Sequence, residues 1–108
     1  MHKQDLSYDY RRIVGAYVRE HRERMEMTQA QLAKHLGMGN TMLSAIEVGR
    51  NTVPPDCYFI LADLFGLSCA EFGNFLLRFS NPLLFAMIYG EHTADLKADL
   101  AKITKQPR

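Results

Sequence analysis

Residues 28–50 read TQAQLAKHLGMGNTMLSAIEVGR, and their pattern predicts two short helices joined by a tight turn. Thr28 and Gln31 have the T-x-x-Q spacing of a capping box, in which each side chain bonds a free backbone amide at a helix start. The first helix is therefore expected at residues 29–36. It should end at Gly37, because glycine adopts a positive φ without strain. The side chains expected to be buried are Ala30, Leu32, Ala33 and Leu36.

The second helix of the pair is expected at residues 40–48, with Gly49 ending it. Leu43 and Ile46 are apolar and three residues apart, so they should face inward. This orientation leaves a set of small and mostly polar residues facing outward. They are Asn40, Thr41, Ser44, Ala45 and Val48.

A longer helix is expected before this pair. Apolar side chains recur there at the spacing of one stripe of an amphipathic helix. The stripe consists of Tyr10, Ile13, Val14, Tyr17, Val18, His21 and Met25. His21 stands at the edge of the stripe, and we interpret it as a partly buried structural residue rather than a ligand or a pH switch. Residues 1–7 are expected to form a short flexible arm.

Two further helices follow the pair. Residues 52–55, TVPP, form a rigid connector, because proline fixes φ and cannot continue a helix. The next helix ends at Gly66 and carries Phe59, Ile60, Ala62 and Leu64. Ser68 and Glu71 form a second capping box, which begins another helix. One side of that helix carries Phe72, Phe75, Leu76 and Phe79.

The last third of the chain continues the helical pattern. Asn81 and Pro82 are a cap and a first-turn proline for a short apolar helix at residues 83–89, which Gly90 ends. Thr93 caps a final helix. Its inner face would be Leu96, Leu100 and Ile103. Because no strand pattern or repeat competes with these signals, the expected fold class is all-α.

Composition places limits on partners and chemistry. The chain has 108 residues, enough for about one core, and a formal net charge of only +1, so a generally basic surface is not expected. Six lysines or arginines stand against three glutamates between residues 10 and 35, so the charge is uneven. No catalytic motif or metal-ligand spacing is present, and we expect neither an enzyme nor a cofactor.

Cysteine usage and hydropathy indicate the cellular compartment. Cys57 and Cys69 match no disulfide framework or zinc signature, and we interpret both as reduced, buried thiols of a cytoplasmic protein. The N-terminus has no signal-peptide pattern. The most apolar stretch, residues 72–89, is interrupted by Arg78 and by Asn81-Pro82, so no membrane span is expected.

The quoted stretch closely resembles the Cro/repressor helix-turn-helix family, also called the xenobiotic response element family. The matching parts are TQAQLA at residues 28–33, Gly37, LSAIEVGR at residues 43–50, and LSCAEF at residues 67–72. The resemblance implies a five-helix, lambda-repressor-like domain with one or two extra C-terminal helices. We expect a DNA-binding domain at residues 1–75 and a helical extension at residues 76–108.

A helix pair of this kind presents its second helix to the major groove of double-stranded DNA. The resemblance places base reading at Asn40, Thr41, Ser44 and Ala45. Their chemistry agrees, since asparagine pairs with adenine, hydroxyls bond bases or phosphate, and a methyl group contacts thymine. Asn40 is the leading candidate, with a plain helix cap as its alternative.

Phosphate contacts are expected on both sides of this helix, at Gln29, Gly39, Met42, Arg50 and Asn51. Gln29 stands in a first turn, where free amides and the helix dipole favour an anion. Gly39 offers only its backbone amide, and Met42 either borders the phosphates or packs inward. The alternative for Gln29 and Arg50 is simple exposure without a contact. Val53 replaces the proline that is usual in the family, which makes loop contacts there less defined.

Arg22 and Glu47 match the positions of a family ion pair that ties the first helix to the recognition helix. We expect a structural role for the pair. Arg22 could in addition contact a DNA phosphate. The alternative is two unrelated surface charges.

The C-terminal third carries more apolar surface than a small core needs, which favours an interface. The expected homodimer contacts are Phe72, Phe75, Leu76, Phe79, Leu83, Phe85, Ile88, Leu96 and Leu100. A dimer would suit a palindromic operator. The alternative is that the last helices fold back and enlarge the core of one chain.

Three functions are therefore weighed. The first is a dimeric transcriptional regulator, a repressor of phage, plasmid or mobile-element genes, acting in the bacterial nucleoid. The second is an antitoxin whose C-terminal helices bind a protein partner, the toxin. The third is an adaptor that has lost DNA binding, which the polar set at Gln29, Asn40, Thr41 and Arg50 disfavours.

Overall fold

The computed structural model describes the backbone of residues 6–90 and the side chains of residues 10–90. This part of the chain contains helices and no strand, which confirms the all-α prediction. The elements are α1 (Leu6–Arg24), α2 (Gln29–Leu36), α3 (Asn40–Glu47), the 3₁₀ turn η1 (Pro55–Cys57), α4 (Tyr58–Phe65), α5 (Cys69–Ser80) and α6 (Pro82–Tyr89). The expected final helix, with Leu96, Leu100 and Ile103, lies outside the described residues.

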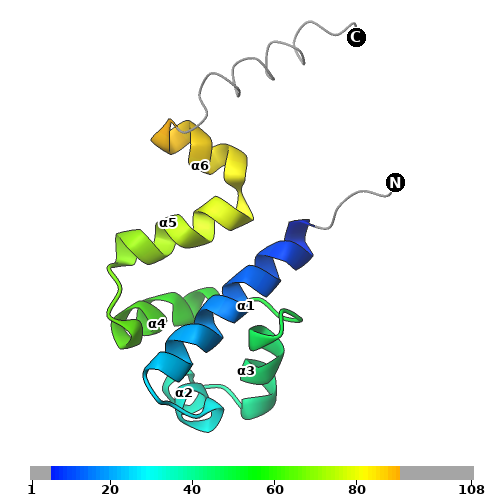
Figure 1. Cartoon of the computed structure of the whole chain (residues 1–108), viewed down its shortest axis with the longest axis vertical. Helices are drawn as coiled ribbons and strands as arrows, with labels where there is room; N and C mark the ends of the chain where they lie inside the picture. The colour runs from blue at the N-terminus through cyan, green and yellow to red at the C-terminus, as the bar shows by residue number, and fades with distance from the viewer. Residues whose placement is uncertain (1–5, 91–108) are drawn as a thin grey trace, which may run out of the picture.

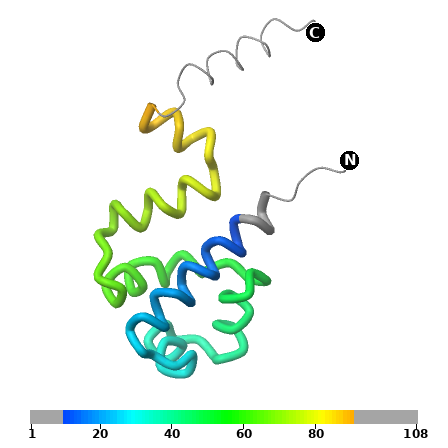
Figure 2. Tube along the Cα trace, in the orientation of Figure 1, coloured from blue at the N-terminus to red at the C-terminus, as the bar shows by residue number. Residues whose placement is uncertain are grey.

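The long helix α1 lies at the centre of the arrangement (Figure 1). α3 and α5 pack against it, and α2 packs against α3 and α4. α6 packs against α5, and the Cα trace shows it extending away from the other helices (Figure 2). Within the described residues, the α2–α3 pair and α6 therefore lie at opposite ends (Figure 1).

The core lies where α1 to α5 meet. Its largest fully buried side chains are Val18, Leu32, Leu43, Ile46, Leu61 and Phe72. Burying one such side chain contributes about 1.5–3 kcal/mol, so this cluster is what holds the helices together. Aromatic rings extend the core between α1 and α5, where the ring centroids of Tyr17 and Phe75 are 4.0 Å apart.

Local capping chemistry sets the helix ends as predicted. Both capping boxes, at Thr28 and at Ser68, are present with their reciprocal hydrogen bonds. Gly37, Gly66 and Gly90 end α2, α4 and α6 in the left-handed conformation. These bonds satisfy backbone groups that a helix end would otherwise leave free.

Two helix boundaries differ from the prediction. α1 already begins at Leu6, inside the arm expected at residues 1–7, because no glycine or proline interrupts the helix there. α3 ends at Glu47, one residue earlier than expected, and Val48 is its C-cap. The boundary expected between residues 75 and 76 falls inside α5, and the separate role of residues 76–108 stays a prediction.

Several burial predictions are wrong. Ile13 lies at the edge of the α1 stripe, Met25 lies in the turn just after α1, and both are exposed. Ala30 is exposed because the inward face of α2 is set by residues 29, 32, 33 and 36, which leaves position 30 on the solvent side. Cys69 is exposed at the first position of α5, whereas Cys57 is buried, and both thiols are free.

Of the four residues named for α4, Ala62 is buried and Leu64 packs against the core, but the other two are exposed. Phe59 and Ile60 are exposed, at 73% and 38% of their accessible surface. The inward stripe is instead formed by residues 58, 61, 62 and 65, which have helical spacing. Six of the eight residues of α4 are large and apolar, so the sequence holds no polar stripe that would mark its outer face.

Candidate nucleic-acid interface

The turn between α2 and α3 determines which residue caps the second helix. Gly39 is the N-cap of α3 and makes no side-chain capping bond, so Asn40 is the first residue inside the helix. The alternative role of Asn40 as the cap is therefore excluded. The Asn40 side chain is exposed.

The two faces of α3 separate as predicted. Leu43 and Ile46 are buried, with exposed fractions of 0% and 1%. Asn40 and Thr41 are exposed on the other side, and Ser44 and Ala45 are half-buried. The polar face of α3 is thus held outward by two anchored side chains.

A concave site of about 420 Å³ lies over this outer face. Its lining consists of Gln29, Asn40, Thr41, Ser44, Ala45, Arg50 and Asn51. All seven were predicted as base or phosphate contacts, and the fold brings them together from α2, α3 and the following loop. Gly39 and Met42, predicted with them, do not line the site. Met42 is partly buried and packs against the core, as its alternative interpretation holds.

The loop after α3 is held close to the helix by backbone hydrogen bonds. The amides of Arg50 and Asn51 donate to the Ala45 carbonyl oxygen, at 2.8 and 3.3 Å. Arg11 Nε of α1 donates to the Gly49 carbonyl oxygen at 3.3 Å. Asn51 Nδ2 lies 3.4 Å from Met42 Sδ. The backbone of the loop is therefore held in place, and the exposed Arg50 side chain lines the concave site from it.

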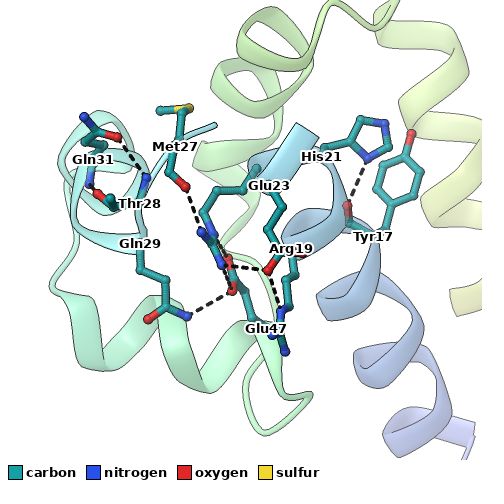
Figure 3. Close-up of polar contacts among 10 residues, drawn as sticks. Tyr17, Arg19, His21, Glu23, Met27, Thr28, Gln29, Gln31 and Glu47 are labelled. Carbon is teal, nitrogen blue, oxygen red and sulfur yellow. Dashed lines mark hydrogen bonds and ion pairs between the residues drawn. The ribbon is translucent and has the colours of Figure 1, made fainter. Parts of the chain in front are cut away.

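Behind the site, Arg22 of α1 and Glu47 of α3 form a buried ion pair (Figure 3). Arg22 Nε lies 2.7 Å from Glu47 Oε2, and Arg22 Nη2 lies 3.0 Å from Glu47 Oε1. The hydrogen bond to Glu47 raises the pKa of Arg22. A bidentate pair of this geometry is stronger and more directional than a single contact, so the two residues are not unrelated surface charges.

Arg22 also holds the turn that precedes α2. Its Nη1 donates to the Met27 carbonyl oxygen at 2.8 Å, next to the Thr28 cap (Figure 3). One guanidinium thus fixes α1, this turn and α3 relative to one another.

Gln29 has a partner that the sequence reasoning missed. Its side-chain Nε2 donates to Glu47 Oε1 at 3.0 Å, so Glu47 joins α2 as well as α1 (Figure 3). Both residues had been singled out, but for separate roles. Their proximity depends on how α2 crosses α3, which periodicity along one helix does not reveal.

His21 takes no part in this network. Its Nδ1 donates to the Tyr17 carbonyl oxygen at 2.9 Å, and its ring packs 5.0 Å from that of Phe65, centroid to centroid. It is half-buried between α1 and α4, as expected for a structural histidine.

The residues predicted for a dimer interface divide into three groups. Phe72, Leu76 and Phe85 are buried within the single chain, and Phe75 is half-buried. Phe79, Leu83 and Ile88 are exposed, at 36%, 64% and 57%. Leu96 and Leu100 lie outside the described residues. Apolar surface for a partner is thus available at the end of α5 and on α6.

Among residues 6–90, no group of three or more histidine, cysteine, aspartate or glutamate side chains could hold a metal ion. No helix in this range is long and apolar enough to cross a membrane.

Comparison with known proteins gives a family for the chain. No curated protein and no solved structure is matched significantly. A family model described as a helix-turn-helix domain matches residues 13–73, more than half of the chain, from α1 into α5. The matched range includes every residue that lines the concave site. The protein therefore belongs to the helix-turn-helix domain family.

Proposed function

We propose that this protein is a sequence-specific regulator of transcription that binds double-stranded DNA and inserts α3 into the major groove. The observation that carries the proposal is the concave site, in which α2, α3 and the next loop present donors, acceptors and methyl groups on a single surface. The resemblance of the protein to the Cro/repressor family is carried by its sequence motifs. The proposal includes no catalytic step.

Base reading is assigned to the outer face of α3. Asn40 can bond the N6 and N7 edge of adenine through both ends of its amide. Thr41 and Ser44 offer hydroxyls, and the Ala45 methyl can contact the thymine methyl group. Because Leu43 and Ile46 anchor the opposite face, these side chains approach the groove from a rigid support.

Phosphate binding is assigned to the two edges of the same site. Gln29 stands in the first turn of α2, where backbone amides and the helix dipole favour an anion. Arg50 and Asn51 line the same site from the loop after α3. Such contacts set the register of the protein on DNA and supply much of the affinity without reading sequence.

A homodimer is the state that suits this function. α6 has no charged side chain, and five of its large apolar residues are exposed: Leu83, Leu84, Met87, Ile88 and Tyr89. A helix that is apolar on all sides is normally covered, and two-fold pairing through α6 would cover it. A dimer would bind a palindromic operator, and we favour repression as the outcome.

The exposed α6 also fits a second function. An antitoxin would use this surface to bind a toxin and its helix-turn-helix to bind its own promoter. Co-purification of a stoichiometric partner encoded by the neighbouring gene would favour this second function over self-association.

The proposal is tested by titrating labelled duplex DNA with wild-type protein and with Arg50→Ala at several salt concentrations. Wild-type affinity should fall steeply with salt, because lysine and arginine contacts release counterions from DNA. Arg50→Ala should weaken binding to every sequence and reduce the salt slope by about 1. Absence of salt-dependent binding by the wild-type protein would refute DNA binding.

A further inference from the structure

Glu47 does more than pair with Arg22, because its carboxylate accepts hydrogen bonds from two other helices. Oε2 accepts from Arg22 Nε at 2.7 Å, and Oε1 accepts from both Arg22 Nη2 and Gln29 Nε2, each at 3.0 Å. The Glu47 side chain is only 2% exposed. Figure 3 shows the Gln29 amide directed toward this carboxylate.

This contact determines the orientation of the Gln29 amide. An ionised carboxylate only accepts hydrogen bonds, so Nε2 and not the carbonyl oxygen of Gln29 must face Glu47. One N–H of Nε2 is then occupied, and the directions of the second N–H and of the carbonyl oxygen are fixed with it. Because Gln29 also lines the concave site, this fixed amide is one of the groups that DNA would meet.

We propose that Glu47 is a positioning residue for DNA binding: its buried carboxylate orients the Gln29 amide, so that the remaining Nε2–H and the backbone amide of Gln29 meet one phosphate. This inference rests on the proposed function. A glutamine held in one rotamer before binding loses less conformational entropy on contact than a free one. Loss of the constraint should weaken binding to all sequences about 3- to 10-fold.

Arg22 keeps the positioning carboxylate in place. It occupies Oε2 and shares Oε1, while its Nη1 bonds the Met27 carbonyl oxygen two residues before Gln29. The position of α3 relative to the start of α2 is therefore set by the same group that orients the amide. A shift of either helix would misplace the phosphate donor.

The orientation can be measured without any variant. In the wild-type protein, ¹⁵N relaxation of the Gln29 side-chain amide should give a high order parameter, close to that of the rigid backbone. An order parameter below about 0.6, typical of a freely rotating side chain, would overturn the proposal.

A DNA-binding cycle tests the consequence. Wild-type protein, Glu47→Gln, Gln29→Ala and the double variant are titrated with one duplex, and circular dichroism checks that each is folded. Glu47→Gln should lose about 3- to 10-fold in affinity, and the double variant should lose less than the product of the two single losses, because without the Gln29 side chain the carboxylate has no amide to orient. Additive losses would refute positioning while leaving DNA binding intact, whereas a wild-type protein that binds no duplex would refute the proposed function itself.

Glu23→Gln provides the matched control. Glu23 Oε2 lies 3.9 Å from Arg22 Nη2, so this variant also removes a negative charge beside Arg22. Glu23 is more than half exposed and bonds Arg19 rather than Gln29. The control should leave both the Gln29 order parameter and the DNA affinity unchanged. An equal loss in Glu23→Gln would show that net charge, and not the Gln29 contact, produces the effect.

Discussion

At the scale of single residues, Glu26 holds a conformation that suits glycine better. Within residues 6–90 it is the only non-glycine residue with a positive φ, at 57°. The Glu26 amide donates to the Glu23 carbonyl oxygen at 3.0 Å, and the Met27 amide to that of Arg22 at 3.1 Å. These bonds form the left-handed ending of α1, in which an L side chain is strained against its own backbone.

Glu26→Gly should therefore stabilise the protein, by about 0.5–1 kcal/mol after the entropic cost of glycine is subtracted. Urea unfolding of wild-type and variant protein measures the change. Glu26→Ala is the control, because it removes the same charge but keeps a β-carbon in the left-handed conformation. If Glu26→Ala is stabilised as much as Glu26→Gly, the effect comes from charge and not from backbone strain.

The sequence was sufficient to select the residues of the candidate site but not all of their contacts. Gln29, Asn40 and Arg50 were predicted from a motif and from side-chain chemistry, and the structure places them around one concavity. The bond from Gln29 to Glu47 could not be predicted, because it depends on the distance between two helices. The sequence did not decide between a phosphate-side position and a core position for Met42, because methionine is adaptable enough for either.

At the scale of the elements, the crossing of α1 and α3 depends on a glycine. A β-carbon at Gly15 would collide with the Ile46 carbonyl oxygen and lie 2.9 Å from that of Glu47. The last carbonyls of α3 thus approach the α1 backbone directly. The same crossing carries the Arg22–Glu47 pair.

Gly15→Ala should destabilise the protein although alanine is the better helix former. Steric overlap at a packed crossing costs about 1–3 kcal/mol, more than the propensity gain of about 1 kcal/mol. Gly73→Ala in α5 is the matched control, because a β-carbon there would have no neighbour within 4 Å. That control should gain about 0.5–1 kcal/mol. Thermal unfolding distinguishes the pair, and a stabilised Gly15→Ala would contradict the described crossing.

Local signals predicted the elements better than their orientations. The capping residues Thr28, Ser68 and Asn81 begin α2, α5 and α6 as expected, because caps act through bonds to neighbouring residues. The sequence did not distinguish the inward face of α4, because Phe59 and Ile60 are as apolar as the residues that are buried. Which apolar face is covered depends on tertiary contacts, which a short apolar helix does not encode.

At the scale of the whole molecule, the exposed side of α6 should mediate self-association. Leu83 and Ile88 expose 64% and 57% of their surface, so changing both to serine removes apolar contact area without opening the core. Wild-type protein should have the mass of a dimer in light scattering, and the double variant that of a monomer. DNA affinity should then fall by about 10²–10⁴, because a second half-site is no longer held at high effective concentration.

Phe59→Ser is the control for this experiment. Phe59 is more exposed than either residue, at 73%, but it lies on α4. This variant should remain dimeric. A wild-type monomer would refute the dimer, and a dimer that survives the Leu83 and Ile88 changes would place the interface elsewhere.

The claim that α3 reads base edges is tested most directly by Asn40→Ala. Wild-type protein first selects a preferred duplex from a random pool, and both proteins are then titrated with that duplex and with a scrambled one at several salt concentrations. Asn40→Ala should lose about 1–3 kcal/mol on the selected duplex, keep its affinity for the scrambled duplex, and show an unchanged salt slope. Equal losses on both duplexes would contradict base reading by α3.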